Sequence, residues 1–392
     1  MKTDQRALSA LLRAADSGSV DSLALVLREV LAGSGATDAI LYLSDYNEEL
    51  LRPAPGYSAS EGAPDTIDIE GTLPGRAYGA RELVEDESPE CIRVWVPVVE
   101  RSEPFGVLEL HFDAMDDDKR RMALDAGLMV GHLLMSARSY TDVYELLRRR
   151  RDMNLAAEMH WDILPARHYT GPSLSICGDI EPAYEVGGDA FDYSVNNGVL
   201  DITIMDAMGH GLEAALLSSQ SIGAYRYARR RNLPLEDVVA TIDDALVRQF
   251  GGEKFVTGFF GRLEIDSGGF SWVNAGHVAP LLLRDGRLES PLGSAPSCPM
   301  GLELIDASVT QETTLEANDC LFFYSDGVIE AKTPAGELFT LERLARLVEE
   351  HEVEEGESGH LVRKVIDEVV RHAEGPLKDD ATCLLLQYLG SP

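Results

Sequence analysis

The sequence predicts a two-domain α+β protein in which a long helix joins an N-terminal α/β unit to a larger C-terminal α/β unit. The chain has 392 residues, which is more than one hydrophobic core usually serves. Hydrophobic residues make up 45% of it, enough for two sizeable cores. Helical and strand-like apolar patterns occur on both sides of residues 138–164, a stretch that contains no glycine. These three observations predict the fold class.

Residues 1–138 are expected to form the N-terminal domain. Apolar side chains recur every three or four positions over residues 4–33, which predicts two amphipathic helices. A closing helix is expected near 118–137, after strand-like runs at 39–45, 92–100 and 105–113. This pattern resembles a GAF domain, a small sensor module. The resemblance implies a regulatory role, and the sequence leaves its ligand or partner unknown.

Residues 139–165 are expected to form one linker helix, with a proline only at the end. Its approximate apolar stripe predicts a rod that could pair with a second copy, so a homodimer is expected. Four consecutive arginines occupy 148–151. A short charge run of this kind indicates a solvated or acid-pairing face rather than a nucleic-acid site.

Residues 166–392 are expected to form the second domain, in which short strand-like runs alternate with helices and glycine-containing turns. Helices are expected at 212–231, 235–250, 340–351 and 358–373. Strands are expected at 199–207, 255–265, 269–277, 279–286, 319–325 and 380–389.

Charge and cysteine content exclude several classes of protein. The formal net charge of −33 repels phosphate backbones and anionic lipid, so no nucleic-acid partner is expected. Five cysteines lie far apart with no CxxC pair, which excludes a disulfide framework or a zinc site. No signal peptide and no run of 18 apolar residues is found, which predicts a cytoplasmic protein without a membrane span.

Four acid-bearing turns of the C-terminal region point to chemistry. Each acid ends a strand-like run or lies in a glycine-rich loop, in "GGDAFDY", "MDAMGHG", "YSDGVIEA" and "LKDDATC". Carboxylates that converged on one pocket would repel one another unless a cation neutralised them. Oxygen ligands in this number suit Mg²⁺ or Mn²⁺, and two such ions can promote displacement at phosphorus. The pattern therefore predicts a two-metal phosphatase, with Mn²⁺ and Mg²⁺ equally acceptable.

The order of these motifs resembles the bacterial PP2C-like serine/threonine phosphatases of the SpoIIE and RsbU type. The similarity covers about residues 155–389 and implies a PP2C-like α/β sandwich, with two central sheets flanked by helices. It implies that Asp206 bridges two metal ions and that the carbonyl of Ala207 binds the second. It also implies metal-site roles for Asp326, Asp379 and Asp189, the last directly or through water, and supporting roles for Asp192 and Asp380.

The glycines and histidines of these loops have mechanical explanations. Gly187 and Gly188 would let the backbone turn beside the metals, where a Cβ would clash. Gly209 and Gly211 would permit the turn from the Asp206 strand into the next helix. Within the "NAGH" segment, Asn274 and His277 are expected to organise the loop rather than to bind a metal. Met208 stands where eukaryotic relatives carry a histidine, so His210 is either the general acid or a loop cap.

In families of this kind the substrate is a phosphorylated STAS-domain anti-anti-sigma protein, and the resemblance implies such a partner here. Two alternatives remain open. A diguanylate cyclase would use "GGDAF", but Ala190 replaces its acid and the other acids would have no role. A catalytically inactive signalling scaffold would have no reason to keep acids at all four turns.

Overall fold

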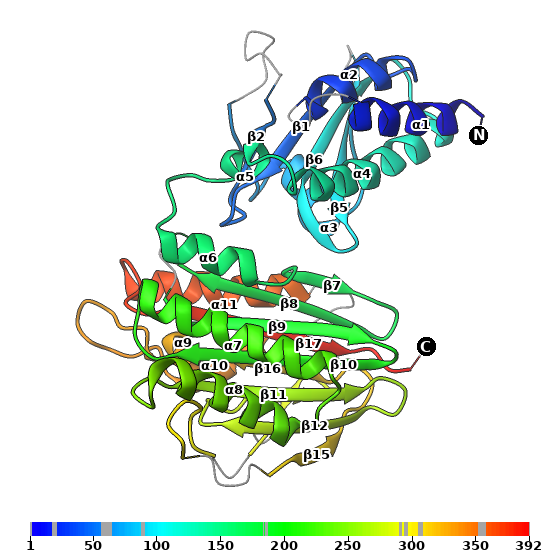
Figure 1. Cartoon of the computed structure of the whole chain (residues 1–392). Coiled ribbons are helices and arrows are strands. Elements are labelled where there is room, and N and C mark those ends of the chain that lie inside the picture. Colours follow the sequence, from blue (N-terminus) through cyan, green and yellow to red (C-terminus); the bar gives the residue numbers. More distant parts are fainter. Residues whose placement is uncertain are drawn as a thin grey trace. The chain divides into compact units, whose positions relative to one another are not determined.

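A computed structural model describes residues 2–17, 22–55, 65–87, 91–182, 184, 187–289, 292–293, 297–304, 309–351 and 358–391. The chain divides into two compact units, Met1–Asp152 and Met153–Pro392 (Figure 1). The N-terminal unit has one sheet and the C-terminal unit has two, and each unit has its own helices.

The N-terminal unit is built on an antiparallel sheet with the strand order β3-β2-β1-β6-β5-β4. The strands are β1 Asp38–Ser44, β2 Leu50–Pro53, β3 Ile67–Asp68, β4 Val84–Glu87, β5 Ile92–Glu100 and β6 Glu103–Phe112. The helices are α1 Lys2–Ser17, α2 Leu23–Ala32, α3 Leu73–Ala80, α4 Asp117–Ala137 and α5 Val143–Leu147. The two amphipathic helices, the three strands and the closing helix predicted for this region are thus all confirmed.

Hydrophobic cores cover both faces of this sheet. Successive side chains of a strand point to opposite faces, so two neighbouring residues of one strand can belong to different cores. Leu108 of β6 packs in a core with Leu27 of α2 and Val130 of α4. Its neighbour Val107 belongs to a second core with Tyr78 of α3. Helices therefore flank the sheet on two sides, and the unit has an α+β architecture.

The prediction of a single linker helix over residues 139–165 is wrong. The structure has two short helices there, α5 and α6 Leu155–Ile163, and residues 148–154 between them are not helical. Asn154 begins α6 as its N-cap, because its side chain accepts a hydrogen bond from the backbone N–H of Ala157. The predicted rod, on which the expected homodimer rested, is therefore interrupted, and the homodimer stays a prediction.

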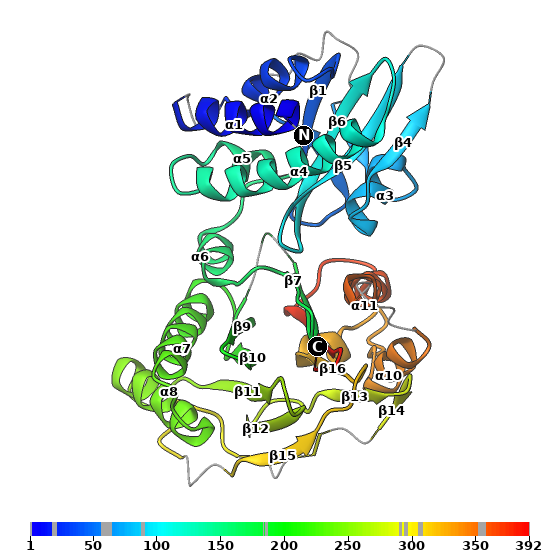
Figure 2. The same cartoon turned by 90° about the vertical axis from the view of Figure 1, so that its right-hand side faces the viewer.

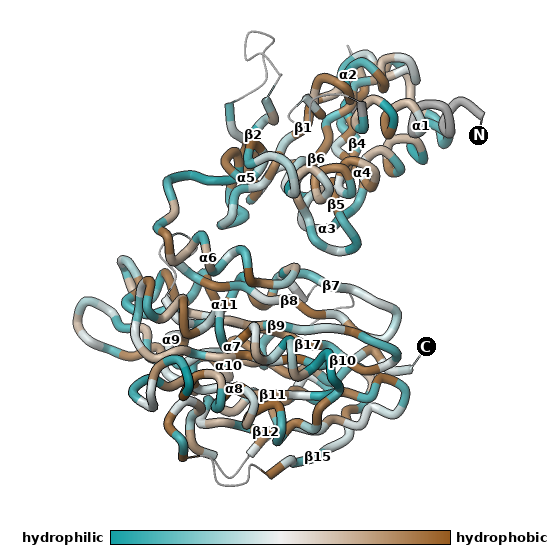
Figure 3. Tube along the Cα trace, viewed as in Figure 1, coloured by the Kyte–Doolittle hydropathy of each residue, from teal (hydrophilic) through white to brown (hydrophobic). Residues whose placement is uncertain are grey.

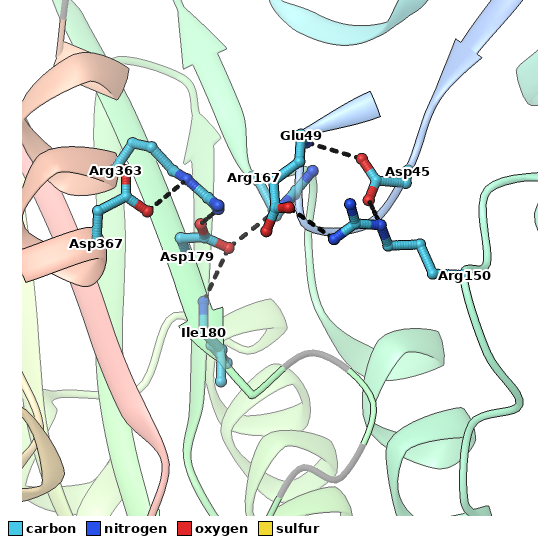
Figure 4. Close-up of polar contacts among 8 residues, drawn as sticks. All are labelled: Asp45, Glu49, Arg150, Arg167, Asp179, Ile180, Arg363 and Asp367. Atoms are coloured by element: carbon cyan, nitrogen blue, oxygen red, sulfur yellow. Dashed lines mark hydrogen bonds and ion pairs between the residues drawn. The ribbon is translucent and has the colours of Figure 1, made fainter. Parts of the chain in front are cut away.

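Contacts of the arginine run explain why the helix breaks. Arg148 is buried, donates from Nε to the carbonyl of Ser44 and lies 4.9 Å from the ring centre of Tyr46. Arg150 pairs with Asp45 at 3.1 Å (Figure 4). These tertiary contacts within the N-terminal unit override the local helical preference. Arg150 pairs with an acid as expected for this run, whereas Arg148 is buried against an aromatic ring and does not lie on a solvated face.

The C-terminal unit contains two antiparallel sheets, ordered β15-β12-β11-β10-β9 and β14-β13-β16-β17-β8-β7. The first is formed by β9 Ala190–Asn196, β10 Val199–Ala207, β11 Val256–Glu264, β12 Gly269–Ala275 and β15 Gln311–Thr314. The second is formed by β7 His168–Thr170, β8 Leu174–Glu181, β13 Leu281–Arg284, β14 Arg287–Leu288, β16 Cys320–Tyr324 and β17 Ala381–Tyr388. The helices after α6 are α7 Leu212–Arg230, α8 Leu235–Phe250, α9 Asp326–Glu330, α10 Leu341–Glu349 and α11 Ser358–Ala373.

Helices cover the outer faces of both sheets. In Figure 2, α7 and α8 lie on one side of the strands, and α10 and α11 lie on the other. Phe259 of β11 and Phe323 of β16 share the core between the sheets, with ring centres 5.6 Å apart. Ile242 of α8 and Val365 of α11 belong to two separate outer cores. This confirms the predicted sandwich of two sheets flanked by helices.

An ion network holds α11 against β8 on the outer side of the second sheet. Asp179 of β8 accepts from Arg167 at 3.2 Å and from Arg363 of α11 at 3.3 Å (Figure 4). Arg363 also pairs with Asp367 one turn further along the same helix. Because Asp179 and Arg167 are buried, this pairing is sheltered from the solvent screening that weakens exposed ion pairs.

Hydropathy follows the layers of the fold. In Figure 3, hydrophobic colour recurs along the strands of each unit, while the segment that leaves α5 begins hydrophilic. Among the helices of the described residues, none is long and apolar enough to span a bilayer.

His160 on α6 should make the C-terminal unit less stable in mild acid. Its side chain is 1% exposed, neither ring nitrogen has a hydrogen-bond partner within the described residues, and burial lowers its pKa to about 4. The unfolded state therefore binds more protons between pH 6.5 and 4, so the free energy of unfolding falls as pH falls through that range. At pH 5 this histidine should account for about 2 kcal/mol of the loss.

Urea unfolding of wild type and His160→Leu at pH 7.5 and pH 5 measures this effect. The variant should lose less stability on acidification than wild type. The exposed His360 of α11 is the matched control, and His360→Gln should keep the wild-type pH dependence. An unchanged pH dependence in His160→Leu would contradict the prediction.

Candidate active site

The acids predicted from the four turns lie where strands of both sheets begin or end. Asp189 directly precedes β9, and Asp206 is the second-last residue of β10. The antiparallel pairing of Ala190 with Met205 brings these two acids to one edge of the first sheet. In the second sheet, Tyr324 of β16 pairs with Cys383 of β17, which brings Asp326, Asp379 and Asp380 to one edge.

The carboxylates of the two sheets influence one another electrostatically. Burial, followed by the charges of Asp326, Asp379 and Asp380, raises the pKa of Asp206 above its ordinary value. Burial and the charges of Asp206 and Asp380 likewise raise the pKa of Asp189. Burial and Asp379 raise the pKa of Asp326. Acids from all four turns therefore lie within electrostatic reach of one another, as the sequence predicts.

Asp380 fixes the turn that carries Asp189. Its buried carboxylate accepts hydrogen bonds from the backbone N–H groups of Gly187 at 2.7 Å and of Asp189 at 3.2 Å. Thr382, two residues further along in β17, donates its hydroxyl to Asp189 Oδ2 at 2.6 Å. The start of β17 thus holds the "GGD" turn of the other sheet in place through both backbone and side chain.

Glycines are required in this turn because the backbones approach closely. A Cβ on Gly188 would lie 2.3 Å from the carbonyl oxygen of Ala207, and one on Gly187 would lie 2.9 Å from Asp380 Oδ2. Gly209 and Gly211 have open space around them but adopt φ of +94° and +73°, which other residues rarely adopt. A side chain would therefore be strained at each of these four positions, while their expected place beside metal ions stays a prediction.

The oxygen atoms that these loops offer as ligands are chemically suited to hard divalent cations. They are carboxylate oxygens and the carbonyl of Ala207, the ligands that Mg²⁺ and Mn²⁺ prefer. Raised pKa values indicate that these acids lack sufficient positive charge for all of them to ionise easily. Within the described residues, no group of three or more Asp, Glu, His or Cys side chains is arranged so that it could hold one ion as it stands.

Comparison with known families decides the identity of this unit. Residues 196–389 match the family model described as stage II sporulation protein E (SpoIIE). The C-terminal unit belongs to this SpoIIE family of PP2C-type serine/threonine phosphatase domains. The predicted resemblance is therefore confirmed for this part of the chain.

Two relatives of the SpoIIE-type domain come from Bacillus subtilis (strain 168). The phosphoserine phosphatase RsbU is 23% identical over 240 residues, which are 61% of this chain and 70% of RsbU. The phosphoserine phosphatase RsbP is also 23% identical, over 61% of this chain and 58% of RsbP. The solved SiaA-PP2C domain of Pseudomonas aeruginosa has a TM-score of 0.50 at 17% identity, covering 59% of this chain and 94% of that domain. The last comparison shows the fold alone.

In this SpoIIE-type domain Asp192 pairs with arginines, whereas Asp189 lies among other acids. Asp192 is buried and pairs with Arg226 of α7 at 2.6 Å and with Arg229 at 3.4 Å. Arg226 also donates to the carbonyl of Ile163 at the end of α6, at 2.5 Å. Asp192 therefore ties β9, α7 and α6 together. The sequence predicted a supporting acid, but it did not reveal these arginines, whose three-residue spacing on one helix was the available signal.

His210 of the SpoIIE-type domain is exposed, as are its neighbours Met208 and Gly209. Within the described residues it makes no hydrogen bond or ion pair. Both roles expected for His210, general acid or loop cap, stay predictions.

The "NAGH" segment of this domain is a hydrogen-bonded loop beside the acids. Asn274 receives a bond from the N–H of His277 and donates to its carbonyl, both at 2.8 Å. The imidazole of His277 is buried, and burial lowers its pKa to about 4, so the ring is neutral at physiological pH. Nδ1 lies 2.9 Å from the hydroxyl of Thr257, and Nε2 lies 3.2 Å from the carbonyl of Tyr324. This loop-organising geometry agrees with the role expected from the sequence.

Proposed function

We propose that this chain is a divalent-metal-dependent phosphatase that hydrolyses phosphoserine or phosphothreonine in a protein substrate. The observation that carries the proposal is the gathering of Asp189 and Asp206 from one sheet with Asp326, Asp379 and Asp380 from the other. The family match of this unit, and the phosphoserine phosphatases RsbU and RsbP among its relatives, support the same activity.

Two Mn²⁺ or Mg²⁺ ions would be held by Asp206, the carbonyl of Ala207, Asp189, Asp326 and Asp379. When bound, such ions polarise a phosphoryl oxygen and lower the pKa of a water molecule. The chain itself supplies the positions of these oxygens. Asp380 holds the turn that carries Asp189, and the absence of a Cβ at Gly188 lets that turn approach the carbonyl of Ala207. His210, exposed in the loop that follows Asp206, would be the group that protonates the departing serine oxygen.

The substrate we propose is a small phosphorylated STAS-domain protein of a partner-switching pathway. The relationship to the phosphoserine phosphatases RsbU and RsbP supports a phosphoserine substrate, and the motif resemblance to the SpoIIE and RsbU type implies that it is a STAS-domain protein. We further propose that the N-terminal unit is a GAF-like sensor that regulates the phosphatase unit. Its antiparallel sheet covered by helices on both faces is compatible with such a module.

The cyclase alternative has no supporting observation. The "GGD" turn lies at the start of β9 in a SpoIIE-type domain, and the residue after Asp189 is the buried Ala190. The remaining acids have a role only in the phosphatase.

Release of inorganic phosphate from a phosphoserine-bearing STAS-domain protein tests the proposed function. We expect release by the full chain with Mn²⁺ or Mg²⁺, and none with EDTA. A phosphotyrosine protein and GTP serve as comparison substrates, and neither should react. Metal-independent release, or formation of a cyclic dinucleotide from GTP, would refute the proposal.

A further inference from the structure

The metal-site acids come from two different sheets, so their separation depends on how the sheets are held together at this edge. Asp206 belongs to β10 of the first sheet. Asp326 follows β16 of the second sheet. The charge of Asp326 is the largest electrostatic influence of another residue on the pKa of Asp206. A group that connects the strands of these two acids would therefore set the spacing between them.

His277 makes such a connection. It follows β12 and contacts one residue beside each of the two acids. Thr257 of β11, which lies 2.9 Å from Nδ1, is the direct pairing partner of Asp206 in the β10–β11 ladder. Tyr324, whose carbonyl lies 3.2 Å from Nε2, ends β16 two residues before Asp326. The imidazole thus spans from the first sheet to the second beside the carboxylates.

The partners of the ring determine where its proton lies. A backbone carbonyl can only accept, so Nε2 carries the hydrogen and donates it to Tyr324. Nδ1 is then the acceptor for the hydroxyl of Thr257. Asn274 is hydrogen-bonded to both the N–H and the carbonyl of His277, so the backbone position from which the imidazole extends is fixed. Each ring nitrogen of His277 therefore has one hydrogen-bond partner, and its role as donor or acceptor is defined.

We propose that His277 is a positioning residue whose Nε2–H bond to the carbonyl of Tyr324 sets the spacing of Asp206 and Asp326, and through it the metal affinity of the site. This inference rests on the proposed function. It differs from a role in folding the loop, because the loop itself is held by Asn274. The bond to Tyr324 crosses between the sheets, whereas the bond to Thr257 stays on the side of the first sheet.

Two substitutions separate these bonds. In His277→Gln the amide nitrogen occupies the place of Nε2 and can still donate to Tyr324. In His277→Asn the shorter amide reaches only the place of Nδ1, so the bond to Thr257 can be kept while the one to Tyr324 is lost. Both variants remove the ring, and Asn has one methylene group fewer than Gln. Thr257→Val is a third variant, because it leaves the ring and its bond to Tyr324 intact.

Binding of Mn²⁺ to the full chain, measured by isothermal titration calorimetry, is the first readout. We expect His277→Asn to weaken binding by about 10- to 100-fold, as is usual when a group that orients metal ligands is removed. His277→Gln and Thr257→Val should stay within about threefold of wild type. At saturating Mn²⁺, the KM for the phosphoprotein should be unchanged in all three, because no substrate contact is altered. Circular dichroism establishes that each variant is folded.

The proposal is overturned if His277→Asn and His277→Gln weaken Mn²⁺ binding equally. It is also overturned if Thr257→Val weakens Mn²⁺ binding as much as His277→Asn does. Should both His277 variants fail to fold, Thr257→Val decides, because wild-type Mn²⁺ affinity supports the bond to Tyr324 and weakened affinity refutes it. A wild-type chain that neither binds Mn²⁺ nor releases phosphate would instead refute the proposed function. The two failures are therefore distinguishable.

Discussion

Asp206→Asn should abolish phosphatase activity and at the same time stabilise the metal-free chain. The loss of activity should be at least about a thousandfold, because Asp206 would hold ions that supply several kcal/mol of transition-state stabilisation. The gain in stability has a separate origin. Burial and three neighbouring acids raise the pKa of Asp206, so its ionised form is unfavourable in the folded state. Its neutral replacement removes that cost.

The stability gain should depend on pH in a defined direction. An acid whose pKa is raised by folding destabilises the folded state only where the unfolded chain would be ionised, so the cost grows as pH rises above about 4. In EDTA, Asp206→Asn should exceed wild type by about 1 to 3 kcal/mol in free energy of unfolding at pH 8, and by less at pH 5. Urea unfolding at both pH values measures this difference.

Asp266→Asn, in the exposed turn between β11 and β12, is the matched control. It should leave both activity and stability unchanged. Full activity in Asp206→Asn would contradict the assigned metal site. A stability loss at pH 8 would contradict the electrostatic account of the acid cluster while leaving the metal assignment intact.

Asp192→Asn should be the most destabilising single change among the acids of the "GGDAFD" segment. Removing this buried charge leaves Arg226 and Arg229 without their carboxylate. Breaking one side of a buried ion pair costs about 3 to 5 kcal/mol, because a buried charge is left without compensation. The same change should weaken the attachment of α7 to β9, so we expect activity to fall as well.

The exposed pair of Asp244 and Arg248 on α8 is the matched control for this prediction. Its members are 70% and 80% exposed, and the pair joins residues four apart on one helix. Such pairs contribute about 0.5 kcal/mol or less. Asp244→Asn should therefore unfold in urea almost as wild type does. If Asp192→Asn unfolded at the same urea concentration as Asp244→Asn, the buried ion network would not have the importance assigned to it.

The sequence predicted most elements of the fold because their patterns are local. Alternating or continuous apolar runs located β10, β11, β16 and β17 to within one or two residues. β8 was not predicted, because Gly178 in its interior weakens a strand pattern. The structure gives a reason for that glycine, since a Cβ there would lie 2.6 Å from the ring of Phe191. The need for glycine arises from a strand of the facing sheet and leaves no local signal.

The prediction of the linker helix was also wrong because of contacts with a distant segment of the chain. Residues 148–151 favour a helix locally, but Arg148 and Arg150 are held by groups near residue 45, about a hundred positions earlier in the chain. The acids of the active site were predictable because each lies at a strand end, a position that the sequence marks. The bonds that orient them, from Asp380, Thr382 and His277, were not, because a hydrogen bond between distant segments has no sequence pattern.

The anchoring of the "GGD" turn by the start of β17 has a consequence for how the enzyme forms. The bonds from Gly187 and Asp189 to Asp380 span 193 and 191 positions of the chain. Contacts of such high sequence separation form slowly, because their loop-closure entropy is lost before they contribute any energy. The catalytic centre should thus be completed only when β17 inserts between β8 and β16. Substitutions that slow this insertion would lower the yield of active enzyme without altering any residue of the site.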